Sequence, residues 1–142
     1  MSGSRHKARR AAVQALYQWD LTEQDPDQIE SHFISEHNLT GADSEYFNAL
    51  VRQVPLYHQE LDSNIAPCLD REMENVDPVE KAILRIAAYE LEYQKEIPYR
   101  VVLDEAIKLS KAFGSDQGYK FVNGVLDKLA LVLRSEENAD KS

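Results

Sequence analysis

Apolar side chains recur at intervals of three and four residues along almost the whole chain, which places them on one side of successive α-helices. The period-two alternation of a half-buried β-strand is missing, and so are the short hairpin turns that join such strands. The pattern predicts an all-α fold of about six or seven helices, with a subdomain boundary near residue 70.

The first half of the chain carries three helical patterns. The first spans residues 5–20, and the second runs from Asp25 and Pro26, an N-cap and first-turn pair, toward His37. Their predicted inward residues are Ala8, Ala12, Ala15, Leu16 and Trp19, followed by Ile29, Phe33 and Ile34. The third pattern begins near Asp43. We expect it to kink or break at a proline, because a proline ring removes a backbone donor and clashes with the preceding turn; this residue is Pro55.

The clearest helix start in the second half is Asp77, followed by Pro78 at the first helical position and Glu80 three residues after the cap. The same helix carries Glu90 on its inward stripe, so this carboxylate needs another helix to cap or a basic partner. Gly124 lies within the inward pattern of the last helix, which predicts the close approach of another backbone. Two further helices are expected, one from Pro98 to Phe113 and one that is capped by Ser115 or Asp116 and continues to Leu133.

These patterns divide the chain into three parts. Residues 1–70 are expected to form an N-terminal bundle with a basic arm, residues 71–135 a C-terminal bundle, and residues 136–142 a disordered acidic tail. A length of 142 residues with a 43% hydrophobic share is sufficient for a buried core. No apolar run approaches the ~20 residues of a membrane span, and no signal-peptide core follows the N-terminal charges, so a cytoplasmic location is predicted.

Charge is distributed unevenly along the chain. The net charge is −9, yet four of the 16 basic residues lie within the first ten positions, where no acidic residue occurs: Arg5, Lys7, Arg9 and Arg10. Clustered cations on an acidic body indicate a local nucleic-acid contact, because distant charges are screened beyond a Debye length of ~8–10 Å. A solvated basic tail is the alternative interpretation of the same charges.

Candidate chemistry is otherwise sparse. Cys68 is the only cysteine, so neither an intramolecular disulfide nor a cysteine-based metal cluster can form. The four histidines are never three or four residues apart, and no glycine-rich phosphate loop or nucleophile elbow occurs. We therefore expect no metal, no cofactor and no enzymatic activity.

Two surface patches are candidates for binding. Arg10, Gln14 and Tyr17 share the face of the first helix that is turned away from Ala8, and they combine a cation, an amide and an aromatic ring. Lys120 and Phe121 interleave charge and aromaticity at the start of the last helix, although core packing is the alternative for the phenylalanine. Cations beside exposed rings favour single-stranded RNA, whose unpaired bases stack on aromatic side chains.

Four sequence blocks occur in an order and at spacings that match a known family: ARRAAVQALY at 8–17, VEKAILRIAAYEL at 79–91, IPYRVVLDEAI at 97–107 and KFVNGVLD at 120–127. Together they resemble the NusB family of bacterial transcription antitermination factors. The resemblance implies two helical bundles and a shared function with the small-subunit ribosomal protein NusE. Such proteins bind the boxA element of nascent ribosomal RNA and act indirectly with other Nus factors and RNA polymerase, without catalysis.

The resemblance also implies roles for individual residues. Glu80 matches a position associated with the protein partner. The predicted RNA-binding residues, including those of the two surface patches, are Arg5, Lys7, Arg9, Arg10, Gln14, Tyr17, Lys120 and Phe121. The first alternative function is a helical protein-interaction module with only incidental RNA contact. A second is a domain of a ribosomal RNA methyltransferase, against which the missing glycine-rich loop argues.

Overall fold

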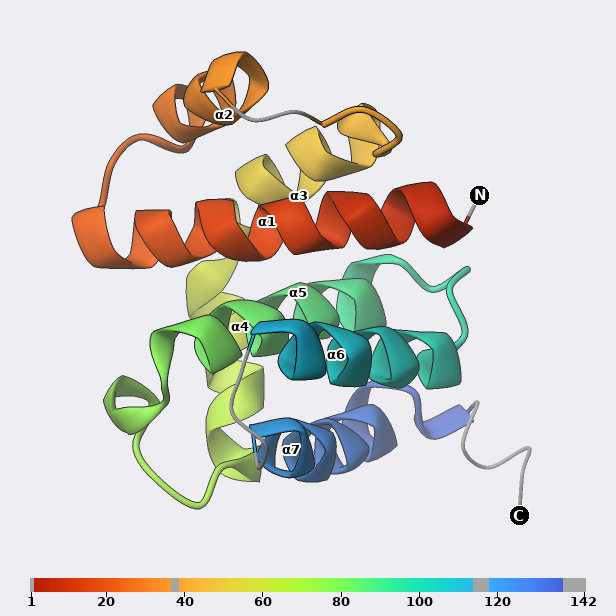
Figure 1. The fold of residues 1–142 in the computed structure, drawn as a ribbon. Helices are drawn as coiled ribbons and strands as arrows, with labels where there is room; N and C mark the ends of the chain where they lie inside the picture. Colours follow the sequence, from red (N-terminus) through yellow and green to blue (C-terminus); the bar gives the residue numbers. More distant parts are fainter. Residues whose placement is uncertain (1, 37–38, 114–117, 137–142) are drawn as a thin grey trace. The chain divides into compact units, whose positions relative to one another are not determined.

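Seven α-helices and two short 3-10 helices make up the described part of the chain, residues 2–36, 39–113 and 118–136 of a computed structural model (Figure 1). These residues contain no strand, so the predicted all-α fold is confirmed. The helices group into two compact units, Met1–His58 and Gln59–Ser142.

The first unit consists of α1 (Ser2–Thr22), α2 (Pro26–Glu36) and α3 (Ser44–Leu56). Helix α1 packs against both α2 and α3 (Figure 1). The core residues of this unit are Ala8, Ala12, Val13, Ala15, Leu16, Ile29, Phe33, Tyr46, Phe47, Leu50, Val51 and Val54. The expectation that Ile34 faces inward is wrong: its side chain is 54% exposed, because it lies one residue past the buried stripe of α2.

Helix α1 ends at an unusual backbone conformation. Glu23 has a φ of 57°, in the left-handed region that non-glycine residues rarely adopt, and its N–H donates to the carbonyl of Trp19 over 2.8 Å. This residue closes the last turn and leads the chain toward Asp25, whose side chain accepts from the N–H of Asp27 at the start of α2.

Replacing Glu23 with Gly is expected to raise the free energy of unfolding by about 0.5 to 1 kcal/mol, because glycine adopts the left-handed region without a steric cost. Denaturant unfolding measures the change. Glu23→Ala is the control, since it also removes the carboxylate side chain but keeps a Cβ at the left-handed φ. Equal stabilities for the two variants would contradict the argument.

Pro55 produces a break and not a continuous kinked helix. Helix α3 ends at Leu56, Tyr57 follows as its C-cap, and α4 (His58–Ile65) begins immediately afterwards. The carbonyl of Pro55 accepts from the N–H of Tyr57 and lies 2.8 Å from Nδ1 of His58. The broken turn is therefore closed by local hydrogen bonds.

The second unit contains most of α4, the 3-10 helices η1 (Ala66–Cys68) and η2 (Met73–Asn75), and the helices α5 (Pro78–Tyr93), α6 (Tyr99–Phe113) and α7 (Gly118–Leu133). Helices α5, α6 and α7 pack against one another in pairs (Figure 1).

The division between the units lies before the expected division at residues 70 and 71. Helix α4 joins the second unit through Asp62, whose carboxylate accepts from Nε and Nη2 of Arg85 on α5 over 2.9 and 2.8 Å. The short helix η1 also packs against α7. These contacts are between residues distant in sequence, and local patterning carries no signal for them.

Both ends of α5 are capped. The Asp77 side chain accepts from the N–H groups of Val79 and Glu80, as the sequence predicted. At the other end the buried guanidinium of Arg134 donates to the carbonyls of Glu90, Leu91 and Gln94. A cation at a helix C-terminus donates to the carbonyl groups that have no partner within the helix, and it interacts favourably with the negative end of the helix dipole.

Helix α7 departs from its predicted pattern at two positions. Val132 is 68% exposed, and Gly124 is also exposed, with no atom within 4 Å of a Cβ built on it. The expected close approach of a backbone to Gly124 is therefore wrong. The predicted tail falls, except for Glu136, outside the described residues.

Candidate nucleic-acid interface

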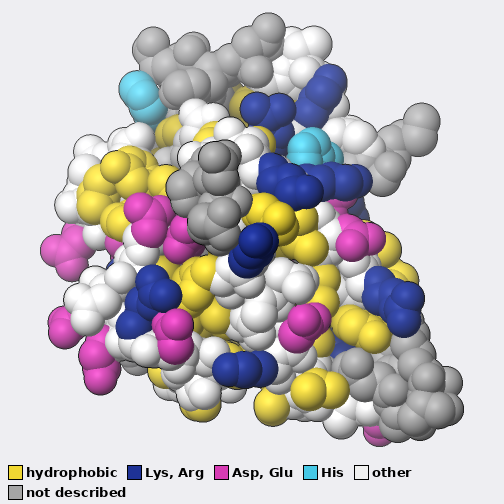
Figure 2. Space-filling view, turned by 60° about the horizontal axis from the view of Figure 1, so that its bottom comes forward, with side chains coloured by type: hydrophobic (Ala, Val, Ile, Leu, Met, Phe, Trp, Pro, Cys, Tyr) yellow, Lys and Arg dark blue, Asp and Glu magenta, His cyan; other side chains and the backbone are white. Residues whose placement is uncertain are grey.

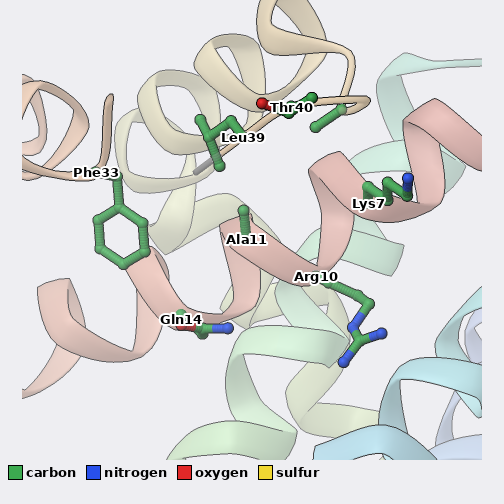
Figure 3. A pocket seen from close by; sticks show the side chains of 8 residues that line it. Lys7, Arg10, Ala11, Gln14, Phe33, Leu39 and Thr40 are labelled. Carbon is green, nitrogen blue, oxygen red and sulfur yellow. The ribbon is translucent and has the colours of Figure 1, made fainter. Parts of the chain in front are cut away.

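The exposed side of α1 forms one wall of a pocket of about 290 Å³ in the first unit (Figure 3). Lys7, Arg10, Ala11 and Gln14 follow one another along the helix, and Leu39 and Thr40 come from the segment that precedes α3 (Figure 3). The described residues that line it are Lys7, Arg10, Ala11, Gln14, Phe33, Leu39, Thr40 and Ala42. Two cations, an amide and a hydroxyl thus line the pocket together with apolar side chains, and none of the described lining residues is a carboxylate.

Lys7 is positioned by a glycine in the loop before α3. Gly41 has a φ of +85°, which favours glycine, and a Cβ built on it would lie 2.9 Å from Nζ of Lys7. The missing side chain therefore leaves the space that the lysine ammonium occupies. Lys7 and Arg10 are both exposed, so a ligand in this pocket can reach both side chains.

The other two cations of the basic arm lie on a different side of α1. The guanidinium carbon of Arg5 lies 4.3 Å from the ring centroid of Tyr46, and that of Arg9 lies 5.4 Å from it. Arg5 is half-buried and also pairs with Asp43 over 3.9 Å, whereas Arg9 is only 3% exposed. The predicted phosphate contact through Arg9 does not fit this burial, because the side chain packs in the unit's interior against α3.

Tyr17 continues the exposed stripe of α1, three residues after Gln14. Its side chain is 38% exposed, and it is not part of the pocket lining. The spacing from Lys7 through Arg10 and Gln14 to Tyr17 is three, four and three residues, which keeps all four on neighbouring positions of one helix face.

Lys120 and Phe121 lie in the second unit, beside a smaller hollow of about 180 Å³. Lys120 is exposed and Phe121 is half-buried. The guanidinium carbon of Arg71 lies 4.2 Å from the Phe121 ring centroid, and Nε of Arg71 donates to Asp70 over 2.7 Å. One face of the ring is therefore covered by a cation held in place by a carboxylate.

One cation that lines this hollow and another that lies against Phe121 were not among the predicted residues. Lys128 also lines it, four residues after Gly124 and seven after Phe121, and this helical spacing is a signal in the sequence that could have identified it. Arg71 belongs to the connector between η1 and η2, where no periodicity indicates which residues approach a ring. Figure 2 shows Lys and Arg side chains interspersed with exposed apolar side chains on the face drawn there.

Glu80, the predicted protein contact, lies in the first turn of α5 and is half-buried. Burial raises the pKa of its carboxyl above the ordinary value, the charge of Asp77 raises the pKa further, and Arg71 opposes both effects. Two carboxylates and a guanidinium thus influence one another at the start of this helix.

The described residues offer no other evident chemistry. They contain no group of three or more His, Cys, Asp or Glu residues that could hold a metal ion. In the same part of the chain, no helix has the length and apolar character needed to cross a bilayer.

Comparison with known proteins gives a consistent result. Residues 6–131 match the model of the NusB family. The chain is 53% identical over 137 residues to a transcription antitermination protein NusB of Nitrosococcus oceani, covering 96% of this chain and 92% of the relative. It is 51% identical over 125 residues to the NusB protein of Shewanella denitrificans, covering 88% and 94%.

Solved structures share the fold. A crystal structure of the antitermination factors NusB and NusE in complex with double-stranded RNA contains a chain that is 30% identical, with a TM-score of 0.84 over 93% of this chain and 99% of that one. The NusB of T. maritima is 28% identical, with a TM-score of 0.79 over 95% and 96%.

Proposed function

Because the chain belongs to the NusB family, we propose that it is a transcription antitermination factor that binds boxA RNA together with the ribosomal protein NusE. The observation that carries the proposal is the pocket on α1, whose described lining includes the cations Lys7 and Arg10 and no carboxylate, on a chain of net charge −9. Cations gathered in this way attract a phosphate backbone in spite of the acidic body.

The residues around the pocket fit the two tasks of RNA binding. Lys7 and Arg10 pair with phosphates, while the Gln14 amide and the Thr40 hydroxyl offer hydrogen bonds to the edge of an unstacked base. Tyr17 offers an exposed ring for stacking. In the second unit, Lys120 supplies a further phosphate contact beside Phe121.

The proposed role consists of binding, without catalysis, in the bacterial cytoplasm where nascent RNA leaves RNA polymerase. Other Nus factors and the polymerase are reached indirectly, through the RNA and through NusE. The similarity to a protein solved with NusE and RNA supports both partners.

A competition titration tests the proposal. Labelled boxA RNA is titrated with the protein, with and without NusE, and challenged with unlabelled boxA or a scrambled RNA of the same composition. We expect boxA to compete better than the scrambled RNA, and NusE to increase the affinity. Equal competition by both RNAs would show that the protein binds RNA electrostatically and without sequence specificity, which would contradict the proposal.

Replacing Tyr17 with Ala is expected to weaken RNA binding by about 1 to 3 kcal/mol, the contribution of one base stacked on an aromatic ring. Tyr17→Phe is the matched control, because it keeps the ring and should keep the affinity. The readout is the dissociation constant for boxA RNA. Unchanged affinity in Tyr17→Ala would remove the stacking role.

Replacing Glu80 with Lys separates the proposed function from a pure protein-interaction module. The change reverses a charge at the start of α5, so we expect loss of NusE binding with boxA binding by the protein alone retained. Pull-down of NusE and titration of RNA are the two measurements. Loss of RNA binding with NusE binding intact would contradict the assignment of Glu80 to the protein contact.

A further inference from the structure

A second pocket of the first unit, here called the acidic groove, lies where α1 ends and α3 breaks. It has a volume of about 380 Å³. The residues that line it are Trp19, Asp25, Pro26, Asp27, Arg52, Pro55 and Leu56. None of them lines the pocket assigned to RNA, which begins with Lys7 and continues only to Gln14 along α1.

The groove displays apolar surface because the helix is broken at Pro55. Leu56 is the last residue of α3 and is 69% exposed. His58 lies 2.8 Å from the Pro55 carbonyl and meets the Trp19 ring edge to face, with centroids 5.3 Å apart. His58 therefore contacts both the Trp19 ring, which lines the groove, and the backbone at the helix break. Leu21, two residues further along α1, is 55% exposed.

The surroundings of this apolar surface carry negative charge. The segment from Trp19 to Glu30 holds five carboxylates, on Asp20, Glu23, Asp25, Asp27 and Glu30, and no lysine or arginine. Arg52, the one cation of the lining, donates to both carboxylate oxygens of Glu30 over 2.8 and 3.0 Å and lies 3.8 Å from Asp27. The positive charge of Arg52 is thus compensated, and the carboxylates of Asp25 and Asp27 make the net charge of the groove negative.

We propose that the acidic groove docks a basic segment of a partner protein, with an apolar side chain seated on Trp19 and Leu56 and flanking Lys or Arg side chains facing Asp25 and Asp27. Charge complementarity selects this partner, because the same carboxylates repel nucleic acid and anionic membrane surfaces. The apolar anchor supplies the burial that exposed charge pairs alone do not. The groove and the RNA pocket therefore select ligands of opposite charge.

Trp19 is the only tryptophan of the chain, so its fluorescence reports directly on the groove. The probe is a short synthetic peptide with a central leucine flanked by arginines, and its control is the same peptide with glutamates in place of arginines. We expect the arginine peptide to shift the Trp19 emission in a saturable way and the glutamate peptide to leave it unchanged.

Variants locate the site, with the anisotropy of a labelled arginine peptide as the readout. Leu56→Ser should raise the dissociation constant about tenfold, the loss of roughly one buried apolar side chain. Leu131→Ser, which alters a 61% exposed leucine in the second unit, should leave it unchanged, and both variants should bind boxA RNA like the wild type.

The proposal would be overturned by no emission shift with the arginine peptide, by equal shifts with both peptides, or by equal peptide affinities for Leu56→Ser and Leu131→Ser. A shift of the Trp19 emission on concentrating the protein alone would also overturn it, because the occupant would then be a second copy of the chain. The proposal does not depend on the RNA function, since the two pockets share no lining residue.

Discussion

Replacing both Lys7 and Arg10 with Ala is expected to lower the affinity for boxA RNA by about 10- to 100-fold at low salt, because two phosphate contacts are lost. The salt dependence should change as well. For a single-stranded RNA each phosphate contact contributes about 0.7 to the slope of log K against log salt, so the double variant should have a slope lower by about 1.4. Both side chains are exposed, and we expect the stability to change by no more than about 0.5 kcal/mol.

The matched control is the double variant Arg100→Ala and Lys108→Ala. It removes the same charge from two exposed positions of α6, which contributes no residue to either candidate RNA patch. Its RNA affinity should remain within about twofold of the wild type. Similar losses in both double variants would show that net charge, and not the pocket on α1, governs binding.

Asp62→Ala is expected to cost about 3 kcal/mol of unfolding free energy. The Arg85 side chain is 8% exposed and shares two hydrogen bonds with the Asp62 carboxylate, so removing the acid leaves a guanidinium in the interior without this partner. Because the pair ties α4 to α5, the loss should appear as a lower transition midpoint in urea. A loss below about 1 kcal/mol would contradict a structural role for the pair.

Asp70→Ala provides the control for this effect. The pair of Asp70 and Arg71 is close, at 2.7 Å, but its side chains are 68% and 41% exposed. Water and salt screen such a pair, so the expected cost is within about 0.5 kcal/mol. Comparable losses for Asp62→Ala and Asp70→Ala would show that burial is not what makes the first pair important.

The features that the sequence predicted correctly depend on residues close together in the chain. The Asp77 cap is such a case, because an aspartate side chain reaches the N–H groups of the next turn. The break at Pro55 is another, since a proline in a helix interior removes a backbone donor and clashes with the preceding turn. The inward stripe of α1 follows from helical geometry in the same way.

The features that the sequence did not predict depend on tertiary neighbours. The sequence groups Arg9 with Arg10 because the two are adjacent, yet in the structure Arg9 is buried beside Tyr46 of α3 and Arg10 is exposed. Arg71 likewise reaches Phe121 from a connector fifty residues away in the numbering. A run of basic residues therefore indicates a candidate binding surface, while the structure shows which of its members are exposed.

Photocrosslinking tests the central claim, that RNA lies along the exposed face of α1, most directly. BoxA RNA carrying 4-thiouridine is irradiated with the full-length protein, and the crosslinked peptides are identified by mass spectrometry. We expect crosslinks within the segment from Lys7 to Tyr17, lost on competition with unlabelled boxA, and a second set around Phe121. Crosslinks concentrated in the acidic segment from Trp19 to Glu30, or absent from α1, would contradict the account.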